Sequence, residues 1–115
     1  MSRDIRLYLE DILESCHRIS LYAEGMSFEH FVKNNLVYDA VLRNIEVVGE
    51  AVKHVPDKVR KQFPEVDWRR IAGMRDIVAH HYFSIHDEIV WDIVVNKIPQ
   101  LTEQVGKILE SSSVD

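Results

Sequence analysis

The sequence is poor in residues that break helices and in the residue that forms disulfides. It contains four glycines, three prolines and one cysteine, Cys16, in 115 residues. A single cysteine rules out an intrachain disulfide, and no apolar run approaches the roughly 18 residues that a membrane-spanning helix needs. The first six residues include three charged ones and lack the apolar stretch of a signal peptide. We therefore expect a cytoplasmic protein without a membrane segment.

Apolar residues, which make up 46% of the chain, recur at helical spacing rather than in strand-like alternation. The pattern predicts helices over residues 3–23, 28–33, 35–54, 68–81 and 87–110, with a short helical turn over 56–63. The sequence thus predicts an all-α protein, an antiparallel bundle of four to five helices. Residues 1–110 are expected to form one domain and residues 111–115 a frayed tail.

Individual residues refine these expected boundaries. Ser27, Asp67 and Asp87 are predicted to cap the helices that follow them. Pro99 is expected to kink or restart the last helix, because proline lacks a backbone donor. Gly49 lies inside a predicted helix at an energetic cost, which predicts the close approach of another helix.

Charge is unevenly distributed along a chain of net charge −5. Residues 1–52 carry 5 Lys/Arg against 9 Asp/Glu, residues 53–75 carry 7 against 3, and residues 76–115 carry 2 against 7. A local basic patch can bind phosphates even on an acidic protein. The candidates for such contacts are Lys58, Arg60, Lys61, Arg69 and Arg70. A solvated helix face is the alternative interpretation of the same cluster.

Patterns for metals, cofactors and covalent catalysis are weak. Glu14 and His17 form one Glu-x-x-His, which di-iron bundles use in duplicate, but there is no second copy. The clustered histidines at positions 80, 81 and 86 lack a typical zinc spacing. There is also no glycine-rich phosphate loop and no serine-nucleophile motif. The sequence therefore predicts neither a metal nor a cofactor.

The segment from Arg75 to Tyr82 places a cation, a carboxylate, two imidazoles and a phenol within eight residues. Asp76 and His80 are four residues apart, so they would be neighbours on a helix surface. Arg75 falls within the apolar stripe of its helix, so its guanidinium should need an anion, a partner chain or a wet cleft. These groups suit phosphodiester cleavage without a metal. A surface Asp–His pair next to an interface arginine is the alternative interpretation.

Three blocks of the chain resemble the HepT-like ribonuclease toxins of the HEPN superfamily. Arg75, His80 and Tyr82 fall on the fixed positions of an Arg-x4-His-x-Tyr motif. Residues 43–51, Arg-Asn-Ile-Glu-Val-Val-Gly-Glu-Ala, are similar to a helix of that family. Residues 67–75, Asp-Trp-Arg-Arg-Ile-Ala-Gly-Met-Arg, resemble its lead-in to the catalytic arginine. A bare Arg-x4-His is a weak signal, but the three blocks together, in the same order, are specific.

The resemblance implies a HEPN-like fold, a two-fold homodimer and a metal-independent endoribonuclease toxin of a type VII-like toxin–antitoxin pair. Arg75 would stabilise the phosphate, His80 would be the general acid or base, and Asp76 would orient His80. The basic block would guide RNA. The implied partner is a minimal nucleotidyltransferase antitoxin, which would transfer AMP to Tyr82.

Two points stay open at the level of sequence. His81 follows His80, although the position of Tyr82 selects His80 as catalytic. Arg75 and His80 lie about 140° apart on an ideal helix, so they can converge only across a cleft, through a distorted helix end or with a second subunit. The alternative function is a non-catalytic helical dimer that docks the nucleotidyltransferase and binds nucleotide or substrate for it.

Overall fold

A computed structural model describes residues 4–81 and 86–111, apart from the side chains of His80 and His81. Within these ranges all regular structure is helical, which confirms the all-α prediction. The elements are α1 (Ile5–Tyr22), α2 (Phe28–Lys33), α3 (Asn35–Lys53), α4 (Asp57–Gln62), α5 (Trp68–Ala72), α6 (Met74–His81), α7 (Asp87–Asp92), the π-helical segment η1 (Ile93–Lys97) and α8 (Ile98–Glu110). The predicted tail falls largely outside the described residues.

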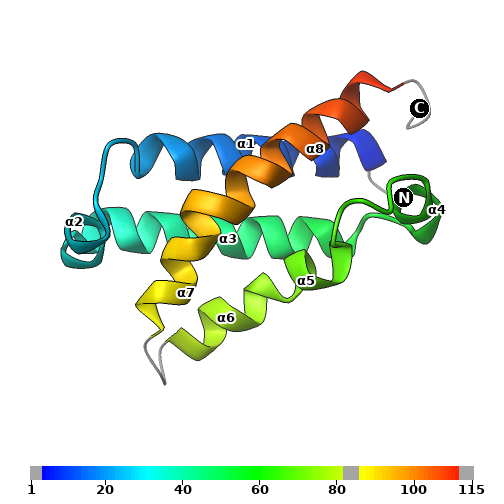
Figure 1. The fold of residues 1–115 in the computed structure, drawn as a ribbon. Coiled ribbons are helices and arrows are strands. Elements are labelled where there is room, and N and C mark those ends of the chain that lie inside the picture. The colour runs from blue at the N-terminus through cyan, green and yellow to red at the C-terminus, as the bar shows by residue number, and fades with distance from the viewer. Residues whose placement is uncertain (1–3, 82–85, 112–115) are drawn as a thin grey trace.

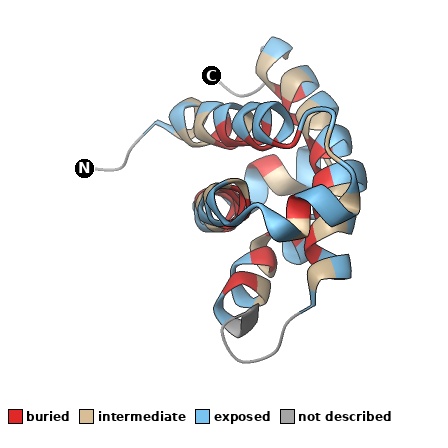
Figure 2. Ribbon diagram, turned by 90° about the vertical axis from the view of Figure 1, so that its left-hand side faces the viewer, coloured by how far each residue is buried: buried red, intermediate tan, exposed pale blue. Residues whose placement is uncertain are grey.

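The two longest helices, α1 and α3, lie side by side and antiparallel (Figure 1). Helix α8 crosses over α1, while α5 and α6 pack along another side of α3. Each long helix contributes one apolar stripe to a shared core, which Figure 2 shows as buried surfaces turned toward one another. The most deeply buried side chains include Leu9, Ile12, Ile19, Val41, Ile45, Val48, Val52, Ile98, Leu101 and Ile108. Helix α3 is therefore the central element, with neighbours on several sides.

Two of the three predicted caps are confirmed. The Ser27 hydroxyl accepts a hydrogen bond from the His30 amide at 3.1 Å, and the Asp67 carboxylate accepts one from the Arg70 amide at 3.2 Å. Each side chain satisfies a backbone donor that the first helical turn leaves unpaired.

The prediction that Asp87 caps the last helical region is wrong. Helix α7 begins at Asp87 itself, and His86 at the cap position makes no side-chain cap bond. The Asp87 carboxylate instead accepts a 2.6 Å hydrogen bond from the Tyr38 hydroxyl. Burial, and then this hydrogen bond, raise the pKa of Tyr38, so the phenol stays protonated and can donate. The bond ties the start of α7 to the start of α3.

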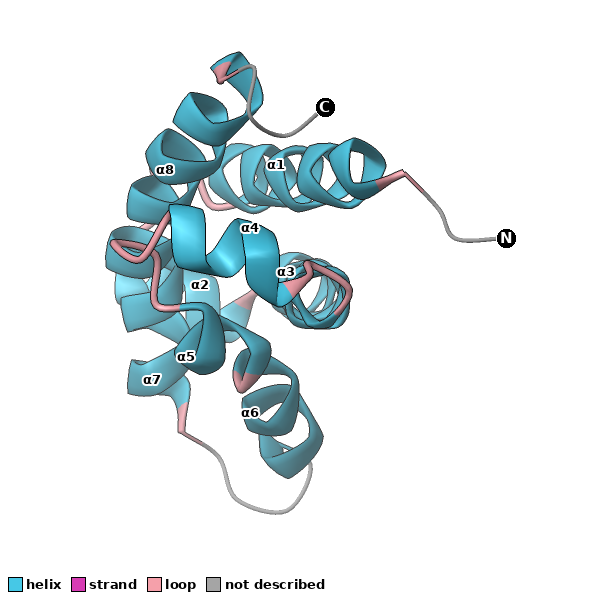
Figure 3. Ribbon diagram, turned by 90° about the vertical axis from the view of Figure 1, so that its right-hand side faces the viewer, coloured by secondary structure: helices cyan, strands magenta, loops and turns pink. Residues whose placement is uncertain are grey.

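Two of the predicted helical segments are interrupted, one of them where the sequence predicts no break. The segment 68–81 is divided at Gly73 into α5 and α6 (Figure 3). The segment 87–110 widens into the π-helical η1, and Pro99 lies in the first turn of α8 that follows. Since proline cannot donate to the preceding turn, an α-helix cannot pass Pro99 unbroken. The expected restart at Pro99 is confirmed.

The lone cysteine is a core residue. Cys16 is fully buried, and this burial raises the pKa of its thiol to about 12, against a smaller opposing effect of a hydrogen bond with Thr102. The thiolate, which is the nucleophilic form, is therefore absent near neutral pH. No helix in the described part of the chain is long and apolar enough to cross a membrane.

Candidate active site

Gly49 sets the distance between α3 and α6. A Cβ atom added at Gly49 would lie 3.1 Å from the Arg75 amide nitrogen, 3.2 Å from the Arg75 Cβ and 3.3 Å from the Ala72 carbonyl oxygen. Only glycine leaves room for this approach without a shift of the neighbouring backbone. The close helix contact predicted from Gly49 is confirmed, and it places Arg75 directly against α3.

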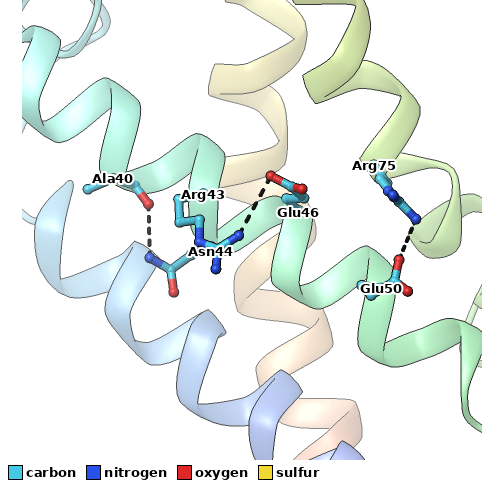
Figure 4. A network of polar contacts seen from close by, with 6 residues as sticks. All are labelled: Ala40, Arg43, Asn44, Glu46, Glu50 and Arg75. Carbon is cyan, nitrogen blue, oxygen red and sulfur yellow. Dashed lines mark hydrogen bonds and ion pairs between the residues drawn. The ribbon is translucent and has the colours of Figure 1, made fainter.

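The anion that Arg75 was expected to need is Glu50. The Arg75 guanidinium donates a short hydrogen bond to the Glu50 carboxylate, and the two side chains are 46% and 49% exposed (Figure 4). Arg75 thus lies beside the buried stripe rather than in it, where the sequence pattern placed it, since Met74 and Val78 of the same helix are buried and the Arg75 side chain is not. A half-exposed pair of this kind contributes at most about 1 kcal/mol. A phosphate could therefore displace Glu50 from Arg75.

Glu50 belongs to a row of polar side chains along α3. Glu46, Glu50 and His54 follow one another at four-residue intervals, which places them on one face of the helix. The His54 Nε2 atom lies 3.8 Å from a Glu50 carboxylate oxygen, too far for a hydrogen bond. The His54 ring stacks on Tyr8 of α1, with centroids 4.8 Å apart and planes inclined by 10°. This face borders a surface pocket of about 340 Å³ that Arg75 also lines.

The remaining motif residues are placed only in part. Asp76 is exposed on α6, and α6 stays helical to His81, so Asp76 and His80 keep their four-residue spacing on one helix. The His80 side chain and Tyr82 lie outside the described residues. Because the helix is regular from Arg75 to His80, a distorted helix end between them is excluded as the route to convergence. A cleft or a second subunit remains.

The residues of the basic block differ in their surroundings. Lys58, Lys61 and Arg69 are exposed. Arg60 is partly exposed, and its guanidinium donates to the Val52 and Val55 carbonyls at 2.8 and 2.9 Å. Arg60 therefore satisfies acceptors at the C-terminal end of α3.

Arg70 and Arg75 also lie apart. Arg70 lines a second pocket, of about 240 Å³, together with Lys97 and Gln104. Its guanidinium lies 3.6 Å from the Asp67 carboxylate. The structure therefore brings Arg75 together with Glu50 and His54, and not with the other cations of its sequence block.

The sequence interpretation missed Glu50 as the partner of Arg75. Gly49 predicted that another helix approaches, but not which side chain of α3 that helix meets. The buried Asn44, whose amide donates to the Ala40 carbonyl at 2.9 Å, was also unassigned. Figure 4 shows the Asn44 amide on the Ala40 carbonyl and the Glu50 carboxylate opposite Arg75. In the same segment, Gly49 permits the close approach of α6.

Comparison with known proteins identifies the family of the chain. The family model described as ribonuclease HepT-like matches residues 12–108. The chain belongs to the HepT-like ribonuclease family.

Three curated relatives match this chain over most of their own length. A Methanocaldococcus jannaschii protein, provisionally named as an RNase, is 41% identical over 108 residues, which cover 94% of this chain and 89% of the relative. A Caldanaerobacter subterraneus protein with the same kind of name is 42% identical, with 91% and 94% covered. The "Probable ribonuclease HepT" of Thermococcus cleftensis is 35% identical, with 94% and 98% covered. No solved structure resembles the chain closely enough to count as a match.

Replacing Gly49 by alanine tests the helix contact against a matched control. Gly106 lies within α8, and an added Cβ there meets nothing within 4 Å. We expect Gly106→Ala to raise the free energy of unfolding by about 0.5–1 kcal/mol, because alanine favours a helix over glycine. Gly49→Ala should instead lower it by about 1 kcal/mol, since the new methyl group overpacks the α6 backbone. Denaturant unfolding of both variants measures the difference.

The same substitution should disturb the site. A shift of Arg75 by a few tenths of an ångström should lower RNA cleavage about tenfold, given that a 1 Å misplacement can cost about a hundredfold. Gly106→Ala should leave cleavage unchanged. Equal stabilisation by the two alanines would contradict the close contact at Gly49.

Proposed function

We propose that this protein is a metal-independent endoribonuclease and acts as the toxin of a type VII-like toxin–antitoxin pair. The observation that carries the proposal is the placement of the motif arginine, Arg75. It is half-exposed at a surface pocket and held by a single displaceable carboxylate, in a chain of the HepT-like ribonuclease family. The names of the relatives support ribonuclease activity as the general class.

The reaction follows from the chemistry of the motif residues. The His80 imidazole takes the proton of a ribose 2′-hydroxyl, whose oxygen attacks the adjacent phosphorus. The bond from phosphorus to the 5′-oxygen breaks, and the imidazolium returns a proton to the leaving oxygen. Arg75 donates to the phosphate oxygens as their charge increases, and Asp76 orients His80. The products are a 2′,3′-cyclic phosphate and a 5′-hydroxyl.

The position of the two groups on α6 supports a homodimeric enzyme. Arg75 and His80 lie about 140° apart around α6, which favours a site built from two subunits over a site built from a single α6. A two-fold axis between copies of α6 would bring Arg75 of one subunit toward His80 of the other. RNA would approach along exposed cations of α4 and α5, namely Lys58, Lys61, Arg69 and Arg70. Arg60 is left out of this set because its guanidinium donates to carbonyls at the end of α3.

Cleavage in the presence of a chelator tests the proposal. Purified protein is incubated with total RNA in excess EDTA, and the new ends are identified by their reactivity with phosphatase and kinase. We expect cleavage at an unchanged rate, with cyclic phosphate or its hydrolysis product on one side and a 5′-hydroxyl on the other. Loss of cleavage on chelation would contradict the mechanism. Intact RNA throughout would favour a non-catalytic module that docks its partner.

The proposed partner is a minimal nucleotidyltransferase antitoxin that modifies Tyr82. The tyrosine oxygen would attack the α-phosphorus of ATP, release pyrophosphate and acquire AMP. The added anion would stand two residues from His80 and compete with RNA phosphate for Arg75.

After co-expression with the nucleotidyltransferase, we expect mass increments of AMP on the Tyr82 peptide and loss of RNA cleavage. Tyr82→Phe should cleave RNA but escape neutralisation. A neutralised complex with unmodified Tyr82 would indicate steric occlusion instead.

A further inference from the structure

The pocket beside Arg75 offers more than a phosphate contact. It opens between α1, α3 and α6, and its volume of about 340 Å³ lies near the lower end of the range for small-molecule sites. This size suits a nucleotide fragment better than a larger ligand. Its polar and aromatic lining comes from Tyr8 and Asp11 of α1, from Arg43, Glu46, Glu50 and His54, and from Arg75 of α6.

The lining residues of α3 follow a regular order. Glu46, Glu50 and His54 succeed one another at intervals of about 6 Å, one helical turn each, and Arg75 stands opposite the middle one. A phosphate bound to Arg75 would therefore have Glu46 on one side and His54 on the other. Each phosphate of RNA joins two nucleosides. With the phosphate on Arg75, one flanking base would lie at the Glu46 end of the pocket and the other at the His54 end.

The Glu46 end combines an acceptor with a donor. The Glu46 carboxylate lies 3.9 Å from the Arg43 guanidinium, an ion pair too long for a hydrogen bond, and Figure 4 shows Glu46 between Arg43 and the Arg75–Glu50 pair. The Watson–Crick edge of guanine presents two adjacent N–H donors next to a carbonyl acceptor. A carboxylate can accept from both donors and an arginine can donate to the carbonyl. Uracil would instead place a carbonyl oxygen against the carboxylate.

The His54 end offers a surface for stacking. The Tyr8 and His54 rings are parallel, and the His54 side chain is 51% exposed. Single-stranded RNA is commonly held by stacking of a base on an aromatic face, which tolerates all four bases. This end should therefore contribute affinity without selectivity.

We propose that the pocket is a dinucleotide subsite that selects guanine at the Glu46–Arg43 end and stacks the other base on Tyr8–His54. The inference rests on the proposed function, because that function places the cleaved phosphate on Arg75. It names the substrate class of the enzyme as RNA with guanosine on one side of the cleaved bond.

Binding of non-cleavable dinucleotides tests the subsite without requiring activity. The probes carry a 2′-O-methyl group at the cleavage position, and pair uridine with each of the four nucleosides in both orders. Binding to the full-length protein is measured by calorimetry. We expect one guanosine-containing order to bind at least about tenfold more tightly than the uridine dimer, as a bidentate base contact allows. Equal binding of all probes, or a preference for adenosine or cytidine, would overturn the assignment of guanine.

Three variants separate selectivity from affinity. Glu46→Gln should remove the preference for guanosine, because the amide presents a donor where guanine also donates. Asp39→Asn removes the same charge from an exposed position of α3 outside the pocket and should keep the preference. His54→Ala should weaken the binding of every probe by a similar factor, about fivefold or more. Persistence of the preference in Glu46→Gln would contradict the inference.

Mapping of cleavage sites distinguishes this inference from the function on which it rests. Wild-type protein that cleaves RNA next to guanosine, with a broadened pattern in Glu46→Gln, supports both. Cleavage without any base preference would overturn the guanine subsite and leave the nuclease proposal standing. Selective binding of guanosine probes by a protein that cleaves no RNA would support the guanine subsite and overturn the nuclease proposal.

Discussion

Arg75→Ala is expected to lower the rate of RNA cleavage by about 100- to 1000-fold, the usual effect of removing one donor that stabilises a developing anion. Alanine removes the only guanidinium of α6, whose partner Glu50 cannot take over its role because it carries the opposite charge. Single-turnover cleavage of a defined RNA measures the effect on the chemical step. Arg75→Lys should recover only part of the rate, because an ammonium lacks the planar fork that matches a phosphate.

Arg18 provides the matched control. Its guanidinium pairs with Glu14 on α1 at 2.8 Å, and both side chains are about as exposed as Arg75 and Glu50. Arg18→Ala and Arg75→Ala should each change the free energy of unfolding by less than about 1 kcal/mol. Only Arg75→Ala should affect cleavage. An Arg75→Ala protein that cleaves at the wild-type rate would remove Arg75 from the mechanism.

The second large effect is expected at His80. His80→Ala should lower cleavage by about a hundredfold or more, because the reaction loses its general acid and base. His81→Ala is the control, since it removes the neighbouring imidazole and leaves the Arg-x4-His-x-Tyr spacing intact. A large loss in His81→Ala with none in His80→Ala would reassign the catalytic histidine.

Mixing the two inactive variants tests whether the site is shared between subunits. In a mixed dimer of Arg75→Ala and His80→Ala, a site built from both subunits would be intact once, with Arg75 from one copy and His80 from the other. Co-refolded mixtures should then recover a measurable fraction of wild-type cleavage. Activity that stays at the level of the separate variants would show that each site draws its arginine and histidine from one subunit.

The arrangement of the helices was largely predictable because it depends on apolar periodicity. The spacing of Leu9, Ile12 and Ile19 and the spacing of Val41, Ile45 and Val48 each define one buried face, and both faces lie in the core. The prediction failed at Asp87, where a side chain can form a hydrogen bond either within its own helix or with a residue distant in sequence. Asp87 could cap its own helix or accept from Tyr38, and only the folded chain brings Tyr38 near.

The candidate site was predictable only in part, for a similar reason. The sequence identified Arg75 and predicted an anion, a partner chain or a wet cleft beside it, but which of these it meets depends on the helix that approaches Gly49. Arg60 looked like the cations beside it, yet the end of α3 supplies acceptors for its guanidinium. Charge counted along a sequence does not reveal which charges are already compensated within the fold.

The hydrogen bond between Tyr38 and Asp87 has a bearing on tolerance to changes in chain length. It attaches the start of α7 to α3, and the contact at Gly49 attaches α6 to the same helix. The helices on both sides of residues 82–85, α6 and α7, thus each contact α3. A change in chain length between these two helices would therefore leave the alignment of Arg75 with Glu50 unchanged. Related chains can accept insertions or deletions between α6 and α7 without loss of that alignment.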